Sequence, residues 1–131
     1  DLHSFPTRRS SDLAIFDIYN KVMNIAASQK AVTSGVSFDL MYVNQQYHRQ
    51  YAFLRKAGTE VLLVAANFAD VPATMDICIP AHAFDYLKLS EKSATATDLL
   101  TDAKLKLTLK RDGAVPVELQ PNSAVILKFR A

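Results

Sequence analysis

Apolar and polar residues alternate along most of the chain after Gly35, in short runs that turn-forming residues separate. Successive side chains of an extended strand point to opposite faces, so this alternation is typical of strands with one buried face. Turns recur roughly every eight to twelve residues, the spacing of an antiparallel sandwich or barrel. The sequence therefore predicts a mainly β fold, an antiparallel β-sandwich of about eight strands preceded by one amphipathic α-helix. The strands are expected at residues 36–42, 50–56, 61–68, 73–79, 95–100, 105–109, 115–119 and 123–129.

Two of these segments carry further information about the sheets. Residues 61–68 are apolar on both faces, which predicts a central strand. Pro116 has no N–H to donate to a neighbouring strand, so residues 115–119 are expected near an edge. The Arg-Asp-Gly sequence at 111–113 predicts a hairpin turn that pairs this strand with residues 105–109.

The segment 14–31 has a helical period instead of the alternation. At about 100° per residue, one half of the helical wheel is apolar and the other half, which includes Asn20 and Asn24, is polar. A Thr-Ser-Gly sequence at 33–35 ends this predicted helix. Residues 81–92 follow neither period and are expected to form a loop with one short helical turn. The apolar half of the predicted helix consists of Ile15, Phe16, Ile18, Tyr19, Val22, Met23, Ile25 and Ala26.

The first 13 residues show no period, and they contain Pro6 and three serines. The stretch from His3 to Leu13 resembles one reading frame of a common short-read sequencing adapter, translated into protein. That resemblance implies that residues 1–13 are a non-native, disordered scar. The remaining residues, 14–131, are then expected to be the truncated tail of a longer open reading frame.

Composition excludes several classes of function. Fifteen basic and 13 acidic side chains give a net charge of +2, and no cluster of Lys and Arg is interleaved with aromatic residues. Nucleic acid is therefore not expected as a partner. The single cysteine excludes an internal disulfide and a four-thiolate zinc site. The longest strictly apolar run, residues 61–66, is too short to span a bilayer.

Candidate catalytic and metal-binding side chains are few and scattered. His3, His48 and His82 lack the spacing of metal ligands. His48 follows a polar turn and is interpreted as a solvated loop residue, with a ligand role as the alternative. His82 is interpreted as a surface or capping residue. Cys78 lies in a predicted strand with no histidine nearby, and it is interpreted as a small packing residue rather than a nucleophile.

Two aspartates imitate a catalytic pair. Asp98 and Asp102 straddle a predicted turn, at a spacing that resembles the paired carboxylates of a glycosidase. The favoured interpretation is that they end a strand and accept hydrogen bonds from turn amides. All three glycines lie at predicted turns, so no phosphate-binding loop is expected. The sequence accordingly predicts no catalytic, cofactor-binding or metal-binding residue, and no cofactor.

Six segments together carry a family resemblance. Three of them read Phe-Asp-Leu-Met-Tyr-Val-Asn at 38–44, Gln-Tyr-Ala-Phe-Leu-Arg-Lys at 50–56 and Leu-Leu-Val-Ala-Ala-Asn-Phe at 62–68. In this order and spacing, the six are similar to the end of an α-amylase-type enzyme of glycoside hydrolase family 13. The resemblance covers residues 14–131. The other three segments are 79–86, 97–101 and 123–129.

The resemblance implies a division of the chain and a role for it. Residues 14–34 would be the last helix of a truncated β/α barrel, and residues 35–131 the C-terminal β-sandwich, called domain C, that packs on the barrel. The family's catalytic carboxylates lie at barrel strand ends, upstream of every residue of this chain. The implied parent is a retaining hydrolase or transglycosylase of α-glucans. This chain would be its non-catalytic domain, which stabilises the barrel.

The same resemblance implies which partners to expect. The partner would be the catalytic barrel of the parent chain, and α-glucan would be bound only through that parent. Without the barrel, one side of the apolar half of helix 14–31 would lose its partner, so self-association through that side is expected. The lone cysteine is compatible with either the cytoplasm or the periplasm.

Two alternatives remain open at this stage. The first is a stand-alone carbohydrate-binding module, which needs an exposed platform of aromatic side chains. The chain has no tryptophan, and Phe38, Tyr42, Tyr51 and Phe53 alternate like core residues, which argues against such a platform. The second is an interaction module, for which the edge strand at 115–119 would supply the contact.

Overall fold

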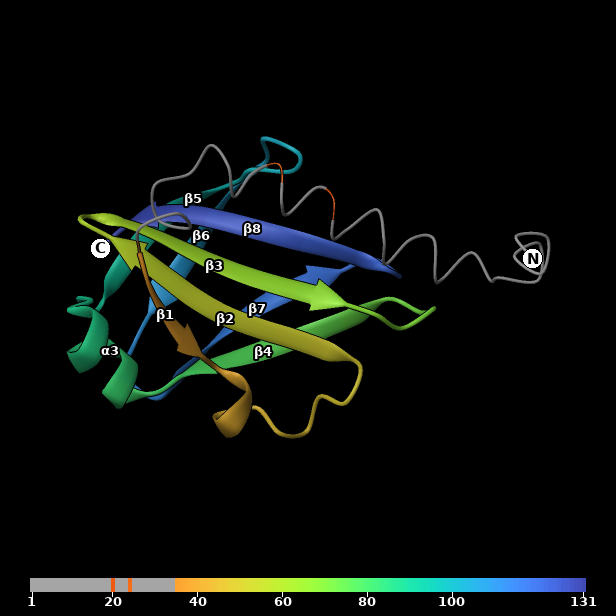
Figure 1. The fold of residues 1–131 in the computed structure, drawn as a ribbon, viewed down its shortest axis with the longest axis horizontal. Coiled ribbons are helices and arrows are strands. Elements are labelled where there is room, and N and C mark those ends of the chain that lie inside the picture. The colour runs from red at the N-terminus through yellow and green to blue at the C-terminus, as the bar shows by residue number, and fades with distance from the viewer. Residues whose placement is uncertain (1–19, 21–23, 25–34) are drawn as a thin grey trace.

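The computed structural model describes Asn20, Asn24 and residues 35–131. This part of the chain forms eight strands in two antiparallel sheets that face each other, with one α-helix at one end (Figure 1). One sheet has the strand order β1-β2-β3-β8-β5-β6 and the other pairs β4 with β7. The predicted antiparallel β-sandwich of about eight strands is confirmed. The elements are β1 (Val36–Asp39), the 3₁₀ helix η2 (Met41–Val43), β2 (Gln50–Ala57), β3 (Glu60–Asn67), β4 (Ala73–Ile79), α3 (Ala81–Leu87), β5 (Lys92–Asp98), β6 (Lys104–Leu109), β7 (Gly113–Leu119) and β8 (Ser123–Arg130).

Two of the predicted segments fall largely outside the described residues. These are the scar at 1–13 and the helix at 14–31 with its expected self-association surface. Within the predicted helix, Asn20 and Asn24 have helical backbone and exposed side chains. Both lie on the polar half of the predicted helical wheel.

The core lies between the two sheets, and β3 is its central strand. β3 is hydrogen-bonded to β2 on one side and to β8 on the other, so the prediction of a central strand at 61–68 is confirmed. Val61, Leu63 and Ala65 point into the space between the sheets. Burying each large aliphatic side chain there contributes about 1.5–3 kcal/mol. The core residues of the opposite sheet include Met75, Ile77, Ile79, Val115, Val117 and Leu119.

The two-stranded sheet explains how a proline can lie inside a strand. Pro116 pairs with Asp76 across β4 and β7. The Asp76 N–H points away from β7, because it donates a hydrogen bond to the Tyr47 hydroxyl at 2.8 Å. In an antiparallel pair of this kind, the partner residue also directs its N–H outward, where Pro116 loses no ladder bond. β7 has one hydrogen-bonded neighbour, so the predicted edge position of 115–119 is confirmed.

The loop before β2 covers the free edge of β4. Besides the bond to Tyr47, the side chain of Asn44 receives the Cys78 N–H on Oδ1 at 2.8 Å and donates to the Cys78 carbonyl at 3.1 Å. Asn44 is fully buried and also donates to the Leu40 carbonyl. Side chains thereby take the place of a neighbouring strand, and this protects the edge from pairing with another chain.

The predicted hairpin between residues 105–109 and 115–119 is wrong. β6 pairs with β5 in the larger sheet, whereas β7 pairs with β4 in the smaller one, so the turn at 111–113 crosses from one sheet to the other. Asp112 holds the turn on the end of β4, because its N–H donates to the Ile79 carbonyl at 2.9 Å. Its carboxylate also accepts the Ala81 N–H at 2.9 Å. Asp112 adopts a left-handed φ of 59°, which aspartate tolerates better than most residues.

Three further boundaries differ from the prediction. The strand expected at 95–100 spans Lys92–Asp98, because the Asp98 carboxylate accepts the Leu100 N–H and starts a turn. The strand expected at 36–42 ends at Asp39, because the Asp39 carboxylate accepts the Met41 N–H at 3.0 Å and starts a turn. Residues 81–92, expected as a loop with one short helical turn, contain the α-helix α3 followed by the start of β5 at Lys92. The helix forms because Ala83, Phe84 and Leu87 place one apolar stripe against the core.

Candidate functional site

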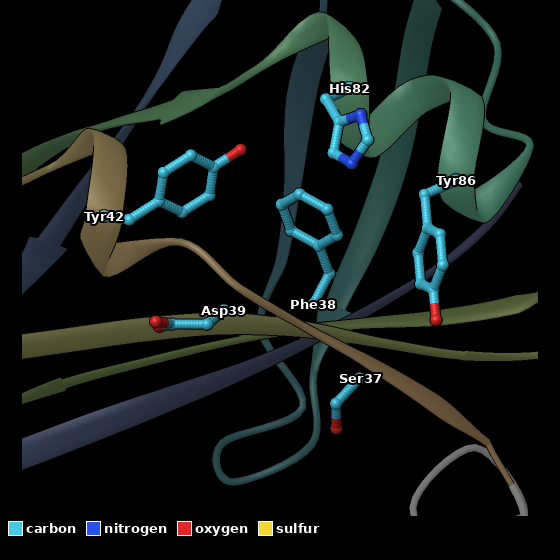
Figure 2. Close-up of a pocket in the computed structure, with 6 residues that line it drawn as sticks. All are labelled: Ser37, Phe38, Asp39, Tyr42, His82 and Tyr86. Atoms are coloured by element: carbon cyan, nitrogen blue, oxygen red, sulfur yellow. The ribbon is translucent and has the colours of Figure 1, made fainter.

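An open pocket lies between the edge strand β1, the helix η2 and the helix α3 (Figure 2). Its volume is about 470 Å³, within the usual range for small-molecule sites. We call it the aromatic pocket. It is lined by Ser37, Phe38, Asp39, Tyr42, His82 and Tyr86.

Local structure explains why four rings meet there. Phe38 is the inward residue of β1 and is 8% exposed, so its ring forms the floor. Tyr42 lies in η2, which turns the chain back beside β1. His82 and Tyr86 are four residues apart on α3 and therefore lie on one face of that helix. Figure 2 shows the rings of Tyr42, His82 and Tyr86 arranged around that of Phe38.

The rings surround a concave surface rather than forming one flat plane. The Phe38 ring centroid lies 6.1 Å from that of Tyr42, 5.8 Å from that of His82 and 5.9 Å from that of Tyr86. These three pairs are tilted by 57°, 50° and 48°. His82 and Tyr86 are stacked, with an interplanar angle of 20°. Such tilted contacts suit the charge distribution of aromatic rings.

The rings of the aromatic pocket are accessible to solvent. Tyr42 is 50% exposed and Tyr86 is 57% exposed, and His82 is also exposed. Within the part of the chain that the structure describes, no residue forms a hydrogen bond with the side chain of any of the three. Their polar atoms are therefore available to a ligand. The expectation that Tyr42 and Tyr51 are core residues is wrong, because Tyr51 is also 44% exposed.

The polar residues of the pocket lie on the other side of β1 from Phe38. In Figure 2 the Phe38 ring rises toward α3, while Ser37 points the opposite way. The Ser37 hydroxyl accepts a hydrogen bond from Arg55. Burial raises the pKa of Tyr51 on the neighbouring strand, and the negative charge of Asp39 raises it further. Tyr51 therefore stays protonated, and the exposed carboxylate at the pocket rim is Asp39.

Contacts at both ends hold α3, and hence the pocket wall, in place. At the N-terminus, Asp112 accepts the Ala81 N–H, as described above. At the C-terminus, the Lys56 ammonium donates to the Leu87 carbonyl at 2.5 Å, which satisfies an unpaired helix carbonyl. Arg111 forms an ion pair with Asp85 at 2.8 Å and lies over the Phe84 ring. The hydrogen bond from Arg111 lowers the pKa of Asp85.

A second surface lies on the outer side of the six-stranded sheet, and we call it the outer apolar face. Leu62, Val64 and Ile126 form its centre, and their exposed fractions are 0%, 7% and 2%. Ala66 and Ala124 continue it along β3 and β8. β3 is therefore apolar and buried on both faces. The partly buried residues around the outer apolar face are Phe53, Ala57, Phe68, Leu99 and Leu100.

The structure places the two candidate aspartates in a turn. Asp98 is 6% exposed, and its carboxylate accepts the N–H groups of Leu100 at 3.0 Å and Ile126 at 3.2 Å. It also accepts the Thr101 hydroxyl at 3.2 Å. Asp102 has a left-handed φ of 62° and donates its N–H to the Asp98 carbonyl at 2.7 Å. These are the contacts of turn-forming residues, as the favoured interpretation requires.

The other candidate residues are separated in space or unsuited to catalysis. His48 is exposed in the bend between Asn44 and β2. Cys78 is half-buried on β4, and burial raises the pKa of its thiol, which disfavours the reactive thiolate. Across residues 35–131, no three His, Cys, Asp or Glu side chains come close enough to hold a metal ion. No helix in the described ranges is long and apolar enough to cross a membrane.

Sequence reasoning missed the aromatic pocket. Its two halves are separated by about forty residues in the chain, and Tyr42 was expected to point inward. One signal was present, because His82 and Tyr86 have the spacing of neighbours on a helix. That spacing becomes informative only when residues 81–87 are known to be helical.

The fold is mainly β, and a family model identifies the domain. The model of the α-amylase C-terminal all-β domain matches residues 42–130. The match covers more than half of the chain, so the chain belongs to this family, and the predicted resemblance to α-amylase-type glycoside hydrolases is confirmed. No curated protein sequence matches the chain significantly.

Several solved structures contain a similar fold. An α-amylase from Anoxybacillus matches 87% of this chain and 22% of its own, with a TM-score of 0.57 and 17% identity. A noncanonic maltogenic α-amylase from Thermotoga neapolitana matches 79% and 22%, with a TM-score of 0.60 and 12% identity. An α-amylase from Geobacillus thermoleovorans, solved with acarbose, matches 79% and 20%, with a TM-score of 0.56 and 14% identity. At these identities the likeness concerns the fold, and the chain spans about one fifth of each enzyme.

Proposed function

We propose that this chain is the non-catalytic C-terminal domain of an α-amylase-type enzyme and that it stabilises a catalytic β/α barrel in the same protein. The observation that carries the proposal is the outer apolar face. A sandwich needs one apolar face per sheet to form its own core. Leu62, Val64 and Ile126 give the larger sheet a second one. An apolar face of this kind is suited to packing against a further layer of protein.

The sequence indicates what this further layer begins with. Residues 14–31 have the apolar half of an amphipathic helix, and they directly precede β1 in the chain. In the proposed parent this segment is the last helix of the barrel, and the barrel continues upstream of it. The parent would cleave or transfer α-glucosidic bonds with paired carboxylates that lie outside this chain.

The first test is the genomic sequence upstream of the codon for Ala14. We expect it to encode a β/α barrel in the same reading frame. The second test compares the full-length enzyme with a version that ends before Gly35. The truncated enzyme keeps its catalytic carboxylates but exposes the surface that the domain covered, so it should lose activity faster on heating. Equal half-lives of the two proteins, or the absence of a barrel upstream, would contradict the proposal.

Matched substitutions test whether the domain contacts the barrel through the outer apolar face. In the full-length enzyme, Leu62→Lys puts a charge into a fully buried apolar site, which costs several kcal/mol. Thr74→Lys changes an exposed residue of the opposite sheet and serves as the control. We expect the first variant alone to uncouple the domain, seen as two calorimetric transitions in place of one. Two transitions already present in the unmodified enzyme would argue against docking.

The isolated chain should not hydrolyse starch, maltooligosaccharides or nitrophenyl α-glucosides. The reason is that Asp98 is the residue most similar to a catalytic carboxylate, and its oxygens already accept hydrogen bonds from backbone amides and a hydroxyl. Turnover that survives purification and disappears in Asp98→Asn would show that the chain is itself an enzyme.

A further inference from the structure

We infer that the aromatic pocket is a binding site for an α-linked glucose oligosaccharide. The choice of a glucan among sugars rests on the proposed function, whereas the choice of a sugar rests on the pocket itself. Three observations support it: the exposure of the rings, their relative tilt, and the fixed position of the elements that carry them.

Exposed rings with polar tips match the chemistry of a sugar. A pyranose ring has an apolar face of C–H groups and an edge of hydroxyls. The faces of Tyr42 and Tyr86 are half-exposed and can pack against the C–H groups. The tyrosine hydroxyls and the His82 ring nitrogens can bond the hydroxyl edge. An aliphatic partner would leave these polar atoms without a hydrogen bond.

Each exposed ring is tilted against the Phe38 floor, so the pocket has a concave lining, which suits a curved oligosaccharide better than a flat one. An extended β-linked glucan presents its faces in one plane and is matched by coplanar rings. In the aromatic pocket, the rings of Tyr42 and Tyr86 are tilted by 57° and 48° to the Phe38 floor between them. An α-1,4-linked chain turns at each residue, so it can follow a concave lining of this kind better than a straight chain can.

The site is organised before any ligand arrives. Phe38 is 8% exposed and packs in the core, so the floor cannot move freely. Asp112 and Lys56 hold the two ends of α3, which carries His82 and Tyr86. A tyrosine has few rotatable bonds, so fixing its backbone removes much of the entropy cost of binding. A shallow pocket of this size can therefore bind a short stretch of glucan at modest affinity.

The experiment is a titration of the 131-residue chain with maltoheptaose, followed by NMR and by calorimetry. We expect saturable binding in which the ring signals of His82 and Tyr86 shift. The substitutions Tyr42→Ala and Tyr86→Ala should each weaken binding at least about fivefold, which is the loss of one good ring contact. Tyr86→Phe keeps the ring and should retain most of the affinity. Cellohexaose, the β-linked counterpart, should bind more weakly than maltoheptaose.

Tyr51→Ala is the matched control, because Tyr51 is 44% exposed on the neighbouring strand but does not line the pocket. Its affinity for maltoheptaose should equal that of the unmodified chain. Thermal unfolding of each variant shows whether it is folded, and the signal shifts in the unmodified chain do not depend on any variant. These substitutions leave the outer apolar face intact, so a negative result here does not bear on the proposed docking to a barrel.

Three results would overturn the inference. The first is no binding of maltoheptaose at millimolar concentration, which would point to a protein partner for these rings. The second is binding that Tyr42→Ala and Tyr86→Ala leave unchanged. The third is equal loss of binding in Tyr51→Ala, which would place the sugar on the other side of β1.

Discussion

The six-stranded sheet borders two apolar surfaces of opposite character. The outer apolar face, on β3 and β8, is made of aliphatic side chains, and Leu62 and Ile126 are 0% and 2% exposed. The aromatic pocket, at the edge strand β1, is made of rings, and Tyr42 and Tyr86 are 50% and 57% exposed. Aliphatic side chains stabilise a structure only when they are removed from water, whereas a tyrosine has an apolar ring and a polar hydroxyl that can stay in water. The first surface is therefore suited to permanent packing and the second to reversible contact.

Truncating one side chain on each surface should separate the two roles most clearly. Ile126→Ala removes buried aliphatic atoms from a closely packed site and should lower the free energy of unfolding by about 2–5 kcal/mol. Tyr86→Ala removes a ring that is already largely in water, so it should cost well under half of that loss. Urea unfolding of the two variants measures both values. Similar losses in the two variants would mean that the pocket is a poorly covered part of the core.

Asp98 links the outer apolar face to the turn beside it, because it accepts the Ile126 N–H from β8. Asp98→Ala leaves this buried N–H and that of Leu100 without acceptors. We expect a loss of about 2 kcal/mol in the free energy of unfolding, in the range for unsatisfied buried donors. Asp102→Asn keeps a residue that tolerates a left-handed backbone and serves as the control. A loss in the control as large as that in Asp98→Ala would contradict the assignment of Asp98 as the anchor.

The outer apolar face was within reach of the sequence, because it depends on a local pattern. Seven of the eight residues at 61–68 are apolar, so both faces of this segment are mostly apolar, and this alone predicted a central strand. The strand at 73–79 was likewise predicted with the bounds that the structure gives β4. Alternation of this kind survives in any fold that buries the strand, so it can be read without knowing the partner strands.

The aromatic pocket depends on contacts between distant residues, and these are not visible in the sequence pattern. Tyr42 becomes exposed because the Asp39 side chain ends β1 early. The position of α3 depends on Asp112, thirty-one residues beyond Ala81, and on Lys56 from β2. The same Asp112 turns the chain from one sheet to the other, which is why the hairpin prediction failed. Side-chain contacts with the backbone decided each of these cases.

The C-terminus of α3 offers a gain in stability close to the pocket. Lys88 ends the helix in a left-handed conformation with a φ of 57°, which costs free energy for any residue with a Cβ atom. Lys88→Gly should therefore raise the free energy of unfolding by about 0.5–1 kcal/mol. Lys88→Ala keeps the Cβ atom and should change it little. If the glycine variant were less stable than the alanine variant, the left-handed cap would not be the source of strain, and thermal unfolding of both variants decides this.

The smallest expected effect is the pH dependence of the ion pair that holds α3 from its solvent side. The hydrogen bond from Arg111 lowers the pKa of Asp85 below its usual value of 3.8, so the folded chain binds fewer protons there than the unfolded chain. The contribution of Asp85 to stability is therefore complete above that usual value and is lost as the pH falls through the lowered pKa. Both side chains are well exposed, so water and salt screen the pair, and the effect stays small.

Asp85→Asn should lower the urea midpoint near pH 6, and the difference from the unmodified chain should shrink toward pH 3 and in high salt. Glu118→Gln, an exposed carboxylate on β7, is the control and should show no such trend. A difference that grows on acidification would mean that Asp85 destabilises the fold when charged, and the ion pair could not be what holds the pocket wall.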